Sequence, residues 1–245
     1  MTMQIGVVAK RGIVLASDTK HRTTEKQQTG DPLSIPSGII NCSKISLCER
    51  HDIAIALAGW SDLDASVGKD LADHLDSLQA ITNDDIGGIL MRWGDSYYAQ
   101  SRLAGAQSFT PLASLLVVRP AARYPLLKLR VNYKSNVLPS EKYLVNGNES
   151  NTAIFWPEYL KVYDELYDLD AATMIAATTI LMGAKLNDPG VGGLEIWQYT
   201  DQWKPVPPEE IEALRVRFDL LQRGIRKAIH LRSKRDRLAP PPSRE

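Results

Sequence analysis

The first eighteen residues, MTMQIGVVAKRGIVLASD (1–18), decide the fold. Two β-rich runs, 3–9 and 13–17, are joined by a short Lys-Arg-Gly turn, which predicts an antiparallel hairpin. A hairpin of this length brings Asp18 back beside residue 2. The stretch therefore predicts a sheet that starts directly after Met1, with no leader, and places an acid next to the second residue.

Clustered strands alternate with helices along the rest of the chain. Residues 23–38 are polar, contain two prolines and two glycines, and are expected to form a loop. This order predicts an α+β fold with antiparallel sheets and helices packed on their outer faces. The expected strands are 40–48, 52–58, 113–119, 126–133, 142–146 and 193–199, and the expected helices are 60–79, 83–104, 150–167, 170–184 and 207–232.

Composition narrows the class of protein. The 245 residues suit one large domain, expected over 1–235, followed by a disordered tail at 236–245. Lys and Arg (29) balance Asp and Glu (29), so no overall charge attracts nucleic acid or an anionic membrane. No apolar run spans a bilayer and no signal peptide is expected. Cys42 and Cys48 are too far apart for a disulfide, so we expect a cytoplasmic protein. Nothing near these cysteines suggests a metal site, and no cofactor is expected.

Thr2 is the first candidate for chemistry. A small second residue permits removal of Met1, which would leave Thr2 with a free α-amine beside its own hydroxyl. A hydroxyl near pH 7 needs a base to act as a nucleophile. An α-amine with a reference pKa of roughly 7.7–8.0 can accept that proton. The alternative is an exposed N-terminal residue without a chemical role.

Asp18, Lys44 and Gly59 are the next candidates. Asp18 either supports Thr2 or caps the turn at the end of its strand. Lys44 lies inside the expected strand 40–48; most strand lysines face solvent, and one directed inward needs a carboxylate partner. Gly59 is either a turn glycine or a backbone N–H left free for a developing oxyanion.

The stretch 187–193, NDPGVGG, is rich in glycine and lies between a helix and a strand. It lacks the Lys-Ser/Thr of a phosphate-binding P-loop and precedes a strand rather than a helix, so a phosphate site is rejected. A role for Asp188 in orienting a neighbouring group stays open.

Together these residues resemble the proteasome β-subunit family of N-terminal nucleophile hydrolases, over residues 2 to about 200. The family pattern has a leading Thr, an Asp sixteen positions later, an inward Lys, an Ala-Gly strand end and a late D-x-x-x-G-G. The long C-terminal helix resembles the bacterial ancestral β-subunit and proteasome-homologue branches. The resemblance implies a four-layer αββα sandwich. The matching segments are Thr2, G12-I-V-L-A-S-D18, Lys44, A58-G59 and D188-P-G-V-G-G193.

Roles follow from the resemblance. Thr2 would be the nucleophile, its pKa lowered by Lys44, which Asp18 holds. The N–H of Gly59 would stabilise the oxyanion and Asp188 would orient Thr2. The substrate pocket would be shaped near His21, Cys42 and Leu57, with Asn148 able to bind the amine.

The sequence departs from the family at two helper serines, where it has Asn148 and Val191. We therefore weigh three functions: a threonine peptidase or amidase acting on peptides or unfolded proteins, a catalytically weak assembly subunit, and an amide ligase or transferase with the same nucleophile. A homo-oligomer is expected, most simply two stacked rings, with an open spiral as the alternative. The residues leave open whether an ATPase feeds the particle.

Overall fold

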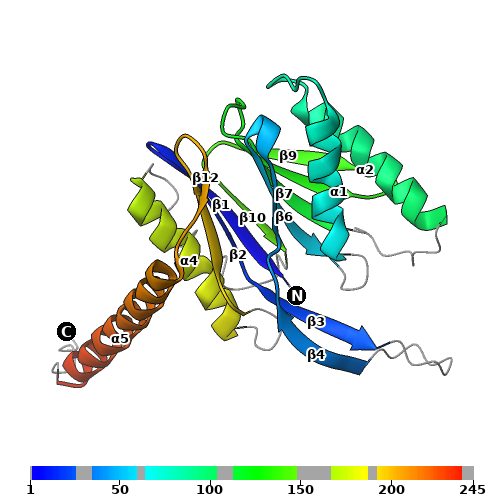
Figure 1. The fold of residues 1–245 in the computed structure, drawn as a ribbon. Helices are drawn as coiled ribbons and strands as arrows, with labels where there is room; N and C mark the ends of the chain where they lie inside the picture. Colours follow the sequence, from blue (N-terminus) through cyan, green and yellow to red (C-terminus); the bar gives the residue numbers. More distant parts are fainter. Residues whose placement is uncertain are drawn as a thin grey trace, which may run out of the picture. The chain divides into compact units, whose positions relative to one another are not determined.

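The computed structural model describes residues 2–25, 35–59, 64–103, 113–147, 167–186 and 192–238. The chain forms two compact units, Met1–Val206 and Pro207–Glu245. In the first unit, two five-stranded antiparallel sheets lie face to face (Figure 1). The second unit contains α5, Pro208–Leu238, whose first turn carries Glu209 and Glu210, as the positive end of a helix dipole favours.

One sheet is built around the N-terminal hairpin and has the order β10-β1-β2-β11-β12. The register pairs Gln4 with Ser17 across the hairpin, as the first eighteen residues predict. Its strands are β1 Met3–Ala9, β2 Gly12–Ser17, β10 Tyr143–Gly147, β11 Glu195–Tyr199 and β12 Trp203–Pro205.

The second sheet has the order β5-β6-β7-β8-β9, with every neighbouring pair antiparallel. A separate pair, β3 with β4, extends from the end of the sandwich near Thr2 (Figure 1). The bounds are β3 Lys20–Glu25, β4 Ile35–Asn41, β5 Ile45–Cys48, the 3-10 turn η1 Glu49–His51, β6 Ile53–Gly59, β7 Ala113–Val118, β8 Leu126–Val131 and β9 Asn136–Ser140.

Helices cover the outer faces of both sheets (Figure 1). The apolar helix α4, Leu169–Leu186, packs on β1 and β2, and α1 (Asp64–Ser77) and α2 (Ile86–Leu103) pack on the second sheet. The predicted four-layer αββα sandwich of two antiparallel sheets is therefore confirmed. Its middle layer buries apolar side chains from both sheets: Ile13, Leu15, Ile45, Ala54, Ala56, Leu116, Val118 and Leu126.

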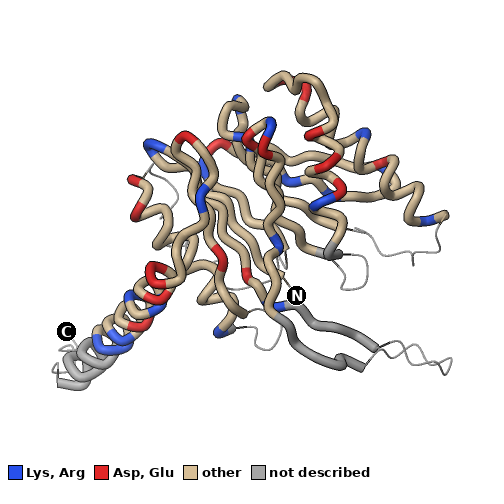
Figure 2. The backbone as a smooth tube through the Cα atoms, viewed as in Figure 1, with Lys and Arg blue, Asp and Glu red and all other residues tan. Residues whose placement is uncertain are grey.

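The helical stripe predicted along α1 packs within its own subunit. Val67, Leu71 and Leu75 are buried against the second sheet, and Leu78 packs on the same cluster. None of the helices in the described ranges has an apolar stretch long enough to span a bilayer. Acidic and basic residues are interspersed along the described chain, in line with its zero net charge (Figure 2).

Several expected elements need correction. Residues 23–25 and 35–38 belong to β3 and β4, so the polar stretch 23–38 is not a loop throughout. The expected strand 40–48 is two strands, and Lys44 lies in the connection between them. The short strands β9 and β12 were not predicted, because neither has a long alternating pattern. The expected helix at 150–167 lies outside the described residues except for its last residue, and so do 239–245 of the expected tail.

A buried polar chain links the two sheets close to the N-terminus. Gln4 Nε2 donates to the Leu57 carbonyl, and Asn146 Nδ2 donates to Gln4 Oε1 at 2.7 Å. Ser114 Oγ donates to Asn146 Oδ1 at 2.6 Å. Gln4 is fully buried and Asn146 is 1% exposed, so every broken bond here would leave a polar group without water.

We expect Gln4→Leu to lower the free energy of unfolding by about 2 kcal/mol, because the Leu57 carbonyl and one N–H of the Asn146 amide each lose a hydrogen bond in a dry site. Urea unfolding at pH 7 measures this. Gln100→Leu, on the exposed face of α2, is the control and should stay within about 0.5 kcal/mol of wild type. An equally small change for Gln4→Leu would contradict the prediction.

Lys128 on β8 is a buried cation, 4% exposed, whose Nζ donates to the Val145 carbonyl at 3.2 Å. Burial, with a smaller effect from Arg130, lowers its pKa from 10.5 to about 8. The folded chain therefore releases this proton at lower pH than the unfolded chain. Between the two pKa values the unfolded chain binds more protons, so the free energy of unfolding gains a term that rises with pH.

Replacing Lys128 with Met should remove that rise. We expect the difference in unfolding free energy between wild type and Lys128→Met to change by about 2 kcal/mol from pH 8 to pH 10, in favour of wild type at high pH. Burial also raises the pKa of Cys48 to about 12, which gives an opposite slope above pH 9. That slope is common to both proteins and cancels in the difference. A difference in unfolding free energy that does not change with pH would contradict the prediction.

Candidate active site around Thr2

The hairpin brings Asp18 against the start of β1. Asp18 N–H donates to the Met3 carbonyl at 3.0 Å, and Met3 N–H donates to Asp18 Oδ1 at 2.8 Å. These two bonds continue the β1–β2 ladder one step beyond its last strand pair, Gln4 with Ser17. They fix the Asp18 carboxylate directly beside Thr2, as the spacing of sixteen residues predicts.

Lys44 reaches into the same place from the connection before β5. Its Nζ donates to Thr2 Oγ1 at 3.0 Å, to Asp18 Oδ2 at 2.9 Å and to the Lys20 carbonyl at 2.7 Å. An ammonium has three hydrogens, and each is matched to an acceptor. The Lys44 side chain is 8% exposed, so the ammonium is held in one position away from bulk water.

Asp18 is the counter-charge of this ammonium. Its side chain is fully buried. Burial raises the pKa of Asp18 above its ordinary value of 3.8, against the opposing effects of the Lys44 ammonium and the Met3 N–H. The bonds of its two oxygens to Lys44 and Met3 oppose that rise and favour the ionised carboxylate. Within the described ranges no group of three or more His, Cys, Asp or Glu side chains is arranged to hold a metal ion.

This arrangement favours negative charge on Thr2. Lys44 Nζ donates to Oγ1 and to two further acceptors, so it cannot also take the hydroxyl proton. A cation at 3.0 Å from Oγ1 stabilises a developing alkoxide and lowers the pKa of the hydroxyl. The geometry therefore supplies an activated oxygen whose proton must leave to a different group.

Other predicted residues lie around this centre. Leu57 N–H donates to the Lys44 carbonyl at 3.1 Å, and Gly59, two residues later, ends β6. Cys42, half-buried, donates its N–H to the Thr19 carbonyl at 2.9 Å. The backbone of His21 belongs to β3. The side chain of His21 and all of Asn148, Asp188 and Val191 lie outside the described residues, so their roles stay predictions.

Comparison of the sequence with protein-family models finds no match, and comparison with curated proteins finds none. Among solved structures, the chain is similar to Anbu, the ancestral β-subunit from Yersinia bercovieri, with a TM-score of 0.63 over 92% of this chain and 95% of that one. The chain has the ancestral β-subunit fold. Sequence identity is 15%, so the likeness confirms the predicted proteasome-type architecture and concerns the fold.

Two glycines let this fold close around the site. Gly147, with φ +112°, ends β10 opposite Met3, and a Cβ there would collide with the Thr2 carbonyl. Gly193, with φ +71°, precedes β11, and a Cβ there would collide with Thr19 Oγ1. Both positions combine a left-handed backbone with close approach, which only glycine tolerates without strain.

Sequence reasoning missed two contributors. Lys20 supplies a carbonyl, which no side-chain motif reveals. Glu195 accepts hydrogen bonds from Ser43 and from the Lys44 N–H. The signal for Glu195 was its place beside the apolar Ile196 in the expected strand 193–199. By itself, an acid in such a place is typical of a strand residue that faces solvent.

Proposed function

We propose that the chain is an N-terminal threonine hydrolase of the proteasome type, in which Thr2 becomes the nucleophile after removal of Met1. One observation carries the proposal: the 3.0 Å contact between Lys44 Nζ and Thr2 Oγ1, with the ammonium held by Asp18. The fold supports the proposal, because Anbu, an ancestral β-subunit, has the same fold. The reaction uses no cofactor.

The proton route follows from the hydrogen bonds. Lys44 donates all three of its ammonium hydrogens, so the base must be another group. The α-amine of Thr2, free once Met1 is removed, lies on the same residue and takes the Oγ1 proton, directly or through one water. Lys44 keeps its charge throughout and stabilises the oxygen anion.

In the proposed reaction, Thr2 Oγ1 attacks a peptide carbonyl carbon and forms a tetrahedral oxyanion, which the Gly59 N–H stabilises. The C–N bond then breaks, the leaving amine takes the proton from the Thr2 ammonium, and an ester joins the acyl group to Oγ1. The α-amine of Thr2, neutral again, then deprotonates a water molecule, which hydrolyses the ester and restores Thr2. Asp188 orients Thr2, and residues near His21, Cys42 and Leu57 shape the pocket for the peptide.

Covalent labelling tests the proposal. An epoxyketone presents a ketone to the hydroxyl and an epoxide to the amine, so it reports both groups. We expect one adduct per chain, mapped to Thr2 by mass spectrometry, in protein that has lost Met1. Absence of an adduct in correctly processed protein would refute the function and leave the assembly-subunit reading. A product carrying an added amine in place of water would identify a transferase.

We further propose a homo-oligomer, most simply of stacked rings in the cytoplasm. Part of the support is exposed apolar surface: Leu103 is 90% exposed and Tyr133 is 85% exposed. A hollow of about 580 Å³ also lies between α1 and α2, lined in part by Trp93 and Tyr97. Like subunits that meet head to tail form closed rings when the rotation closes and open helices when it does not.

Light scattering at micromolar concentration measures the assembly. We expect a mass several times the 27.2 kDa of one chain. Leu103→Glu combined with Tyr133→Glu should lower that mass if the exposed residues lie in contacts, and Lys69→Glu on the exposed face of α1 is the control. A monodisperse species of 27.2 kDa for the wild type would refute the oligomer.

A further inference from the structure

Strand pairing does not hold Lys44 in place. It belongs to the connection 42–44 between β4 and β5, outside any strand ladder. Backbone bonds hold part of this connection, since Leu57 N–H donates to the Lys44 carbonyl and Cys42 N–H donates to the Thr19 carbonyl. The amide side of Lys44 needs a partner of its own.

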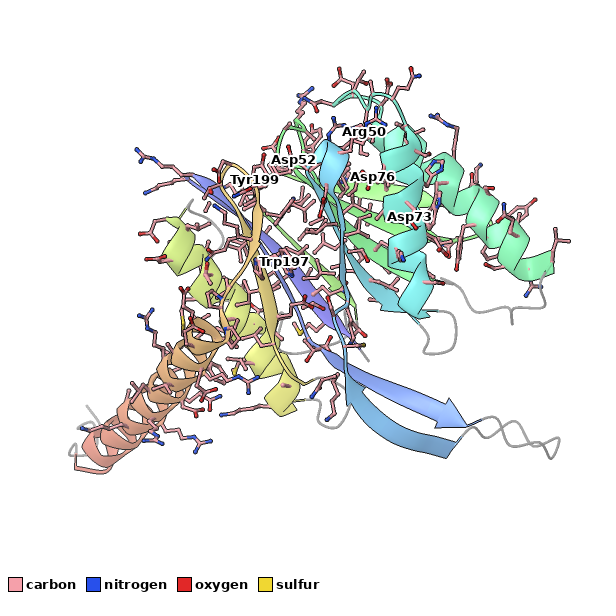
Figure 3. The ribbon with its side chains drawn as sticks, in the orientation of Figure 1. Arg50, Asp52, Asp73, Asp76, Trp197 and Tyr199 are labelled. Atoms are coloured by element: carbon pink, nitrogen blue, oxygen red, sulfur yellow. The ribbon has the colours of Figure 1, made fainter. Side chains whose placement is uncertain are left out.

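Glu195 provides that partner from the opposite sheet. Its Oε1 accepts from Ser43 Oγ at 2.7 Å and its Oε2 faces the Lys44 N–H at 3.4 Å. Trp197 Nε1 donates to Oε1 at 2.9 Å, which fixes the direction of the carboxylate. Figure 3 labels Trp197 on the same strand, β11. Both carboxylate oxygens of Glu195 are therefore directed at the connection or held by the indole.

The position of Glu195 in its sheet ties it to the rest of the site. In the register of β11 with β2, Glu195 lies opposite Ser17, the neighbour of Asp18. Asp18, the counter-charge of Lys44, directly follows β2. Strand β2 pairs with β11, whose Glu195 holds the Lys44 backbone. The ammonium and the backbone N–H of Lys44 therefore both bind acids that belong to, or directly follow, strands of the same sheet.

We propose that Glu195 is a positioning residue for Lys44 and so sets the reactivity of Thr2. The inference rests on the proposed function, because its effect on rate is exerted through the Lys44 ammonium. Glu195 acts on Thr2 indirectly, by holding Ser43 and the Lys44 amide. The three acceptors of the ammonium lie at 2.7–3.0 Å, so a shift of the connection by about 1 Å would break the contact with Oγ1.

Variants of Glu195 separate this role from plain stability. Glu195→Ala should slow the saturated rate of epoxyketone labelling at Thr2 by about 10- to 100-fold, with the inhibitor's apparent binding constant changed less than about 3-fold. Glu195→Gln keeps the length and one oxygen acceptor, and should recover most of the rate. Ser43→Ala, at an exposed residue, should fold normally and slow labelling by about 3-fold.

Gln198→Ala is the matched control. It lies on the same strand, and its Nε2 donates to Thr173 Oγ1 on α4, away from the connection. We expect labelling within about 2-fold of wild type. If Gln198→Ala and Glu195→Ala slow labelling equally, a general effect of β11 replaces the proposal.

A crystal structure of Glu195→Ala tests the positioning without any reaction. We expect Lys44 Nζ to move out of hydrogen-bond distance of Thr2 Oγ1. An unmoved Nζ would overturn the inference even where the labelling rate falls. Lack of labelling in processed wild-type protein would contradict the proposed function alone, and the displacement of Lys44 would still decide the role of Glu195.

Discussion

We expect Lys44→Ala to slow the labelling of Thr2 by an epoxyketone by about 10³-fold, while the protein stays folded. The reason is electrostatic. The Lys44 ammonium lies 3.0 Å from Thr2 Oγ1 and is held there by Asp18. Without it the hydroxyl returns toward its ordinary, unreactive pKa. The fold survives because burial already raises the pKa of Asp18, so the carboxyl can take a proton when its partner is lost.

We expect that Lys44→Arg does not restore labelling of Thr2. The planar guanidinium spreads its charge over a fork of five N–H groups and cannot meet three converging acceptors as a compact ammonium does. The measurement is the rate of adduct formation by intact mass, with circular dichroism as the check on folding. Lys69→Ala, on the exposed face of α1, is the control and should react as wild type. Wild-type labelling in Lys44→Ala would show that the nucleophile is activated in another way.

Asp18→Asn has the second large effect and acts on stability as well as on labelling. The carboxylate accepts from Lys44 Nζ on one oxygen and from Met3 N–H on the other. An asparagine has one oxygen and one NH₂ group, so in either orientation a donor faces a donor. We expect the free energy of unfolding in urea at pH 7 to fall by about 3 kcal/mol, because one buried hydrogen bond is lost and its donor is left facing another donor.

A double variant tests the cause of that loss. Asp18→Leu with Lys44→Met removes both charges and should recover most of the stability of Asp18→Asn, without labelling at Thr2. Comparable instability in the double variant would mean that the backbone bond from Met3 matters more than the charge pair. Recovery without reactivity would separate the structural part of the pair from its chemical part.

The pH dependence gives an independent check on Asp18. Its pKa in the folded chain is raised by burial, so between 3.8 and that raised value the folded chain holds a proton that the unfolded chain has released. The contribution of Asp18 to the free energy of unfolding therefore falls as pH rises through this window. Asp18→Asn lacks the titration, so the advantage of wild type over Asp18→Asn should shrink as pH rises. An advantage that grows would show that the attraction of Lys44 outweighs burial.

The sequence by itself determined the parts of the fold that are local. A two-residue period and a short turn were enough to predict the hairpin of β1 and β2, and with it the place of Asp18 beside the N-terminus. Helical spacing was enough to predict that Val67, Leu71 and Leu75 face the core. These patterns succeed because neighbours in sequence are neighbours in the element, so one periodic face must be buried.

Only the tertiary structure decided how the site is completed. A strand lysine usually faces solvent, and sequence alone placed Lys44 in a strand, which was wrong. Lys44 turns inward because its partners come from chain segments 26 and 42 residues away, and Glu195 holds its amide from 151 residues away. Local periodicity carries no information on such distant pairs. They form because two sheets pack face to face, and a buried ammonium in that interface is stable only where their acceptors meet.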